Sequence, residues 1–260
     1  MRSRDPEVIK EATYVVDVGA EYDPSRNRFD HHQEGGAGER ENGIPYASFG
    51  LVWKQYGAEA CGDEDIARRV DERLVQPTDA ADNGVAICSG LFEGVAEYTV
   101  HDLFSAFVPT WREEDADSDV IFRGCVEIAV LLLRRETQRA RDDQAARSVV
   151  ADAYRRSEDR RIIVLDRYCS WKEVLLQYPE PLFVVYPRED DGTWHVRAVP
   201  RSRASFESRQ AFPISWAAKS DEDLVRESGV SDAVFCHGKR FLAVARSREG
   251  AVTLAERALA

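Results

Sequence analysis

The stretch Phe29-Asp30-His31-His32-Gln33 places a carboxylate and two of the five histidines of the chain in consecutive positions. A second carboxylate, Asp17, lies in the apolar run Tyr14-Val15-Val16-Asp17-Val18-Gly19, which is typical of a strand buried on both faces, as in a parallel sheet. Neutral imidazole beside carboxylate suits a divalent transition metal such as Mn, Fe, Zn or Co. The alternative interpretation is a turn that contains two histidines without a metal function.

Composition indicates a globular, soluble and cytoplasmic protein. The chain has 260 residues, 43% of them hydrophobic, which is enough for packed cores. No apolar run approaches the roughly 18 residues that a membrane-spanning helix needs, and no secretory signal opens the chain. The five dispersed cysteines indicate reduced thiols. A net charge of −12 argues against a broad electrostatic grip on nucleic acid, while leaving room for a local basic groove.

The first part of the chain alternates short strands and helices. A second short strand, Asn27–Asp30, delivers the two histidines, after a turn at Glu21–Ser25. Helices are predicted over Ala47–Ala60 and from Asp63 through Val75. The run Asp79-Ala80-Ala81-Asp82-Asn83-Gly84 then follows, and it is either a turn signal or a pair of oxygen ligands for a metal.

The second part begins after a long helix that the periodicity predicts from Asp119 to Ser157. It contains a strand at Arg161–Asp166, a hairpin of Phe183–Pro187 with Trp194–Val199, a strand pair of Ala233–Cys236 with Phe241–Val244, and a closing helix over Ser247–Leu259. We therefore predict two domains: an α/β parallel-sheet domain over residues 1–158, and a smaller α+β domain over residues 159–260.

Candidate metal ligands and acid–base groups concentrate in the first domain. They are Asp17, Asp30, His31, His32, Asp79 and Asp82. Carboxylates at strand ends lie where open α/β sheets bind ligands. Their chemistry would be two-metal hydrolysis, in which one aspartate bridges the ions and a spare histidine contacts the phosphate or protonates the leaving oxygen.

The second domain offers an anion site at the start of its last helix. Arg246-Ser247-Arg248 precedes that helix, and exposed N–H groups and two arginines favour a phosphate there. The alternative is that Ser247 is only a helix N-cap.

These motifs resemble the Myg exonuclease family of the DHH phosphoesterase superfamily. The resemblance rests on Val15–Gly19, Glu21–Pro24, Arg28–Gln33, Ile44–Gly50, Asp79–Gly84 and Arg246–Ala251, in the order the family has them. It implies a DHH-type domain with a parallel sheet, a smaller substrate-binding domain, and a manganese-type phosphodiester hydrolase whose members act as 3′-5′ exonucleases on RNA.

The resemblance also implies roles for single residues. Asp17 would be the bridging metal ligand and His31 a ligand of one ion, while His32 would face the phosphate with Asp30 in support. The next acidic motif falls at Asp79 to Asp82, and Asp82 is favoured because Asp-Asn-Gly resembles the superfamily's aspartate-centred turn. Arg246-Ser247-Arg248 would contact the substrate.

Two departures from the family pattern accompany the resemblance. The family begins with a strand and a His-x-Gly-x-x-His-x-Asp-Asp-like motif that this chain does not contain, so the first βα unit would be missing and the two-metal site incomplete. Ala243-Val244 stands where the family has two glycines. A valine side chain there would obstruct the close approach of backbone to ligand that glycine permits.

Three functions remain open at this point. The first is a divalent-metal phosphodiesterase, with Mn²⁺ as cofactor, that acts on RNA or on short oligonucleotide 3′ ends. The second is a pseudoenzyme or binding protein that keeps the fold without turnover. The third is a metal hydrolase of a small phosphorylated metabolite. Self-association into a homo-oligomer is compatible with each of them.

Overall fold

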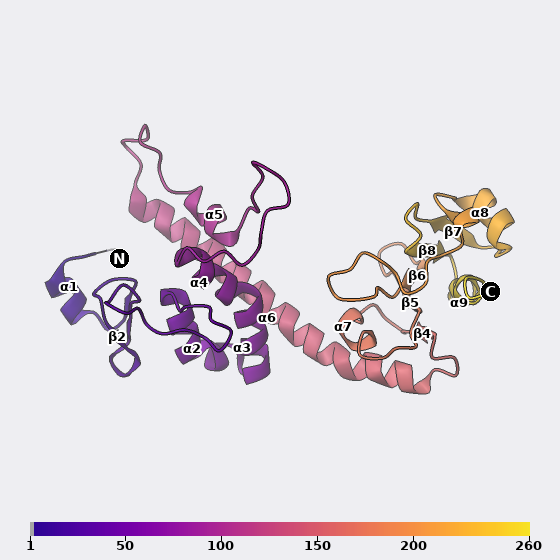
Figure 1. Ribbon diagram of the computed structural model, residues 1–260, viewed down its shortest axis with the longest axis horizontal. Helices are drawn as coiled ribbons and strands as arrows, with labels where there is room; N and C mark the ends of the chain where they lie inside the picture. The colour runs from indigo at the N-terminus through magenta and orange to yellow at the C-terminus, as the bar shows by residue number, and fades with distance from the viewer. Residues whose placement is uncertain (1–2) are drawn as a thin grey trace. The chain divides into compact units, whose positions relative to one another are not determined.

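The computed structural model describes residues 3–260 as two compact units, one ending at Arg141 and the other comprising Asp142–Ala260 (Figure 1). The division falls inside the predicted long helix, α6 (Ser118–Arg156). Composition places the boundary after residue 158, but the two halves of α6 pack in different units. Leu132, Leu133 and Ala140 join an apolar cluster of the first unit, while Val150 and Tyr154 belong to a core of the second.

The first unit opens with helix α1 (Pro6–Glu11) and a small three-stranded sheet. Its strands are β1 (Val15–Val16), β2 (Tyr22–Asp23) and β3 (Arg28–Phe29), in the order β1-β3-β2. The strand β1 pairs with β3 in parallel, and β2 pairs with β3 antiparallel.

Two expectations about this sheet are wrong. The strand β1 is not buried on both faces: Val15 is buried, but Val16, whose side chain points to the opposite face, is 46% exposed. The predicted turn at Glu21–Ser25 instead contributes β2, followed by the short 3₁₀ helix η1 (Pro24–Arg26). Its last residue is followed by Asn27 at φ 58°, which turns the chain into β3.

Four helical segments follow this sheet along the chain, and the first of them contacts β3. They are α2 (Ser48–Cys61), α3 (Glu64–Val70), the π-helical segment η2 (Asp71–Val75) and α4 (Gln76–Asp82). Pro77 has no N–H to complete the ladder and its ring crowds the carbonyl four residues earlier, which accounts for the wider turn just before it. Asp79 and Asp82 therefore lie on a helix, and the predicted turn is confined to Asn83 and Gly84. A short helix, α5 (Val100–Ser105), precedes α6.

The second unit is a five-stranded mixed sheet in the order β4-β5-β6-β8-β7. Its strands are β4 (Ile162–Val164), β5 (Phe183–Pro187), β6 (Trp194–Ala198), β7 (Ala233–Cys236) and β8 (Leu242–Ala245). The predicted hairpin β5–β6 and the strand pair β7–β8 are confirmed as antiparallel pairs, while β4 and β5 pair in parallel. Both units thus combine helices with a sheet that contains one parallel pair.

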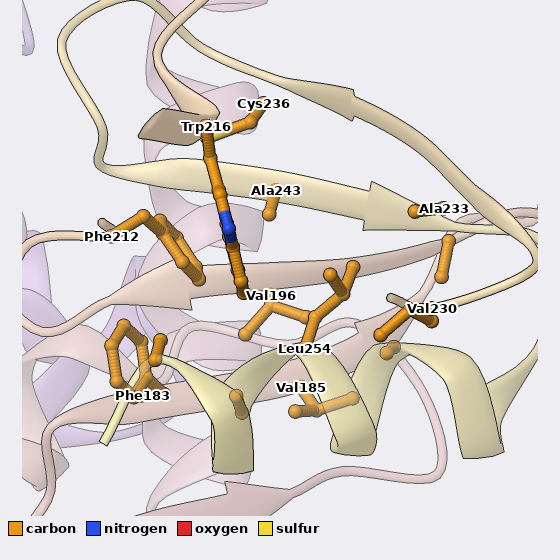
Figure 2. Packing of buried hydrophobic residues seen from close by; sticks show 14 of the residues in the cluster. Phe183, Val185, Val196, Phe212, Trp216, Val230, Ala233, Cys236, Ala243 and Leu254 are labelled. Carbon is orange, nitrogen blue, oxygen red and sulfur yellow. The ribbon is translucent and has the colours of Figure 1, made fainter. Parts of the chain in front are cut away.

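Helices cover this second sheet. They are α7 (Lys172–Leu175), the 3₁₀ turn η3 (Ile214–Trp216), α8 (Asp221–Ser228) and α9 (Arg248–Arg257). Figure 2 shows Leu254 of α9 pointing at Val185 and Val196 of the sheet, with Phe212 and Trp216 closing one end of the same core. None of the helices within residues 3–260 is both long and apolar enough to cross a membrane.

Candidate metal centre

Two parallel strands bring the predicted ligands to one edge of the small sheet. Register pairs Val16 with Phe29, so the residues that follow both strands emerge side by side. The N–H of Asp17 donates to the Phe29 carbonyl at 3.1 Å, which anchors the start of the loop after β1. Asp17 has φ 67°, in the left-handed region that aspartate tolerates better than most residues. This unusual backbone turns the carboxylate towards the histidines.

His31 lies between two carboxylates. Its Nε2 is 3.6 Å from Oδ1 of Asp17 and 3.4 Å from Oδ2 of Asp82, and its side chain is only 8% exposed. Ligand atoms of Asp17, His31 and His32 all lie within 4.8 Å of one another. We refer to Asp17, His31, His32 and Asp82 as the His–Asp cluster. The structure therefore brings together residues that are up to 65 positions apart in the sequence.

Asp30 supports the cluster from beneath. Its carboxylate is 1% exposed and accepts hydrogen bonds from the N–H groups of Ala20, His31 and His32, and from Nδ1 of His32 at 2.6 Å. Burial raises the pKa of Asp30, but these hydrogen bonds outweigh it and the pKa lies below its usual value. Asp30 is thus an acceptor that orients His32.

The orientation of His32 follows from this contact. Because a carboxylate can only accept, Nδ1 of His32 carries the proton and Nε2 projects away from Asp30. The hydrogen bond to Asp30, opposed in part by burial, raises the pKa of His32, and the charges of Asp17 and Asp82 act in the same direction. His32 is 61% exposed, so its Nε2 is accessible to a ligand from solution.

Asp79 does not join the cluster. Its carboxylate is fully buried, accepts a hydrogen bond from the Gly50 N–H at 2.9 Å, and forms an ion pair with Arg40, whose Nη1 is 2.9 Å from Oδ2. The Arg40 guanidinium also pairs with Asp71 through Nη2 at 2.9 Å. Burial raises the pKa of Asp79, and the Arg40 charge opposes the rise. Asp79 therefore fixes α4 from inside, one turn before Asp82.

Three further residues contact Asp17 or Asp79, although the sequence does not identify them as functional. Ser48, the first residue of α2, donates its hydroxyl to Oδ1 of Asp17 at 3.0 Å. Arg40 and Gly50 complete the buried contact with Asp79. Ser48 and Gly50 belong to the stretch Ile44–Gly50, which the sequence marks as a motif. Their partners lie about 30 residues away in either direction, and local patterns do not reveal such pairs.

Gly50 lies so close to Asp79 that a larger residue would displace it. A Cβ atom at position 50 would be 1.8 Å from Oδ2 of Asp79 and 2.7 Å from Nη2 of Arg40. We expect Gly50→Ala to destabilise the first unit by about 3 kcal/mol, because overpacking would push a buried ion pair apart. Thermal unfolding measures the loss.

A matched control is available in α6. Gly124 is helical, and a Cβ atom there would have no neighbouring heavy atom within 4 Å, so Gly124→Ala should be neutral or stabilising by up to about 1 kcal/mol. Equal stability of the Gly50→Ala variant and the wild type would show that the Asp79 contact is not tight.

The cluster residues fit a divalent metal ion. Asp17 and Asp82 supply carboxylate oxygens, and the His31 ring supplies a nitrogen in the same space. His32, held by Asp30 through Nδ1, has the carboxylate–histidine arrangement that orients metal-binding imidazoles. Two carboxylates that converge on one point favour a cation there. This donor set suits Mn, Fe, Zn or Co.

The predicted anion site in the second unit is already served by a side chain. Ser247 is the N-cap of α9: its Oγ accepts from the Gly250 N–H, and its N–H and Oγ both donate to Asp232. A phosphate at this helix end would meet the Asp232 carboxylate. Arg246 and Arg248 are exposed, and Arg246 lies 3.8 Å from Asp221. Ser247 is confirmed as the N-cap of α9, and substrate binding by these residues stays a prediction.

Val244, the departure from the glycine pair, lies within the sheet. It is 7% exposed and pairs with His195 on one side and Phe235 on the other. Its neighbour Ala243 faces the core beneath α9. The valine is therefore part of the packed sheet surface.

Comparison with known proteins places these features in a family. Residues 1–259 match an uncharacterised protein family, UPF0160, whose profile bears the label MYG1 exonuclease. The chain is 32% identical to the human protein named MYG1 exonuclease, over all of this chain and 77% of the human one. It is 30% identical to a MYG1 protein of Dictyostelium discoideum, over all of this chain and 87% of that one. No solved structure matches. The chain thus belongs to the MYG1 exonuclease family, UPF0160.

Proposed function

We propose that this protein is a divalent-metal-dependent phosphodiester hydrolase that removes nucleotides from the 3′ ends of RNA or short oligonucleotides. The observation that carries the proposal is the position of His31, whose Nε2 lies within 3.6 Å of both Asp17 and Asp82 beside an oriented His32. The names of the relatives, MYG1 exonuclease in human and rat, support a nuclease-like function.

The residues divide into ligands and a phosphate contact. Asp17, His31 and Asp82 would hold the ion, for which Mn²⁺ is our choice. When bound, a divalent ion lowers the pKa of a water molecule and neutralises charge on a phosphoryl oxygen. His32 has a raised pKa and an exposed Nε2, so it can hold a proton towards a phosphate oxygen or a leaving oxygen. Asp30 keeps this ring in place.

We also propose that the first unit is a DHH-type domain. The support is the pair of parallel strands whose ends carry Asp17 and the Asp30-His31-His32 run. The three proposed ligands, Asp17, His31 and Asp82, suit one ion, and Asp79 would supply no oxygen to it because its oxygens face Gly50 and Arg40. A two-ion centre would need further donors besides these.

A hydrolysis assay separates the three candidate functions. Single-stranded RNA of about ten nucleotides, labelled at its 5′ end, should be shortened stepwise in Mn²⁺ and remain intact in EDTA. RNA that is bound but never shortened would support the binding protein. Cleavage of dinucleotides without a ladder from the longer RNA would support the hydrolase of a small metabolite. Shortening that persists in EDTA would contradict metal dependence.

A further inference from the structure

A cleft of about 680 Å³ opens beside the His–Asp cluster and shares Asp17 and His32 with it. Its lining combines residues of α1, the loop after β1, and the segment from η1 to β3. Four of the lining residues are cationic: Arg4, Lys10, Arg26 and Arg28. This concentration is notable in a chain of net charge −12.

Three of these cations are available to a ligand. The charge of Arg26 is already neutralised, since Arg26 forms ion pairs with Glu21 and Asp23. Arg28 donates through Nη1 to the Arg26 carbonyl, and among the described residues no carboxylate forms an ion pair with it. Across residues 3–260, no carboxylate lies within ion-pair distance of Arg4 or Lys10.

The carboxylates of the cleft do not cancel this charge. Glu21, which also lines it, is paired with Arg26. Asp17 faces His31 at the cluster end. The uncompensated charge of the rest of the cleft is therefore positive. This part of the cleft adjoins His32, the proposed phosphate contact. Such a surface attracts the phosphate groups of a nucleic acid over short range, even on an acidic protein.

We propose that this cleft holds the phosphates of a single-stranded oligonucleotide next to the one that is cleaved, with Lys10 and Arg28 as the principal contacts. This proposal rests on the proposed function, because it takes the phosphate at the His–Asp cluster as the one that is cleaved and so sets the direction of the oligonucleotide in the cleft. Arginine binds phosphate through a planar fork and lysine as a point charge, so Arg28 orients the chain while Lys10 adds attraction. Apolar lining from Pro6 and Ile9 leaves room for sugars.

The test measures binding without turnover. A fluorescein-labelled eight-nucleotide RNA is titrated with protein in EDTA, and anisotropy gives the Kd at several salt concentrations. The double variant Lys10→Gln, Arg28→Gln should weaken binding at least 10-fold. It should also make the slope of the logarithm of the association constant against the logarithm of the salt concentration less negative by about 1.4, since each phosphate contact of a single strand contributes about −0.7. Lys10→Gln alone changes an exposed side chain and should weaken binding about 3-fold with the fold intact.

The control is Arg135→Gln, an exposed arginine of α6 that does not line the cleft. Its affinity should equal that of the wild type. Unchanged Kd and slope in the double variant, an equal loss in the control, or no binding by the wild type would each overturn the proposal. Bis(4-nitrophenyl) phosphate has no second phosphate, so its Mn²⁺-dependent hydrolysis should survive in the double variant. Failure of the wild type to hydrolyse it would count against the proposed function and leave the binding result decisive for the cleft.

Discussion

Replacing His31 by alanine is expected to lower the Mn²⁺-dependent rate of phosphodiester hydrolysis on the order of 1,000-fold, equivalent to about 4 kcal/mol of transition-state stabilisation. The His31 ring is nearly buried between Asp17 and Asp82, and its Nε2 lies within 3.6 Å of a carboxylate oxygen of each. Its removal would leave the two carboxylates without the nitrogen ligand that completes the donor set. The rate is measured on labelled RNA at saturating Mn²⁺.

His101→Ala is the matched control, because His101 is exposed on α5 and the cluster does not include it. Its rate should stay within 2-fold of the wild type. Asp30→Asn should cost less than His31→Ala, about 10- to 100-fold, since Asp30 holds the His32 ring and would not itself be a ligand in the proposed centre. A His31→Ala variant that retains a tenth of the wild-type rate would refute the ligand assignment.

Replacing Arg40 by methionine is expected to destabilise the first unit by about 3–5 kcal/mol. Arg40 is 7% exposed and pairs with both Asp71 and the fully buried Asp79. Without the guanidinium, the Asp79 carboxylate would be left charged and unpaired in the interior, or would have to take up a proton. Because the protein has two units, hydrogen exchange in peptides from α2 and α4 measures this loss better than one global unfolding curve.

Arg68→Met provides the comparison. Arg68 also pairs with two carboxylates, Asp65 and Glu72, but it is 52% exposed, and loss of such a surface pair costs less than about 1 kcal/mol. Adding Asp79→Asn to Arg40→Met should recover part of the stability, because the orphaned charge is then absent. Equal losses for Arg40→Met and Arg68→Met would disprove the structural role of the buried pair.

The location of the cluster could be predicted from the sequence because short strands, which are local sequence signals, place its residues. Asp17 directly follows β1 and His31 lies two residues after the end of β3, and parallel neighbours place their carboxyl ends together. The position of Asp79 could not be predicted in this way. Asp79 and Asp82 are three apart on one helix, and the family resemblance favours Asp82, but no local pattern shows that Asp79 contacts Arg40 and Gly50 from distant parts of the chain. Ion pairs between residues far apart in the chain produce no periodic pattern in the sequence.

Burial and domain limits show the same contrast. The hairpin β5–β6 is marked by the turn Asp190-Asp191-Gly192 and is predictable from that local signal. The exposure of Val16 depends on whether other elements cover its face of the sheet, which its own apolar run does not encode. Likewise, the division within α6 depends on what each half of that helix contacts.

Direct measurement of Mn²⁺ binding tests the central claim, that the His–Asp cluster is a metal centre. Electron paramagnetic resonance of free Mn²⁺ during titration gives the number of bound ions and their Kd without any need for activity. We expect saturable Mn²⁺ binding by the wild type. The affinity should be at least 100-fold weaker in the Asp17→Ala, His31→Ala double variant and unchanged in His101→Ala. Equal Mn²⁺ binding by the wild type and the double variant, or none by the wild type, would contradict it.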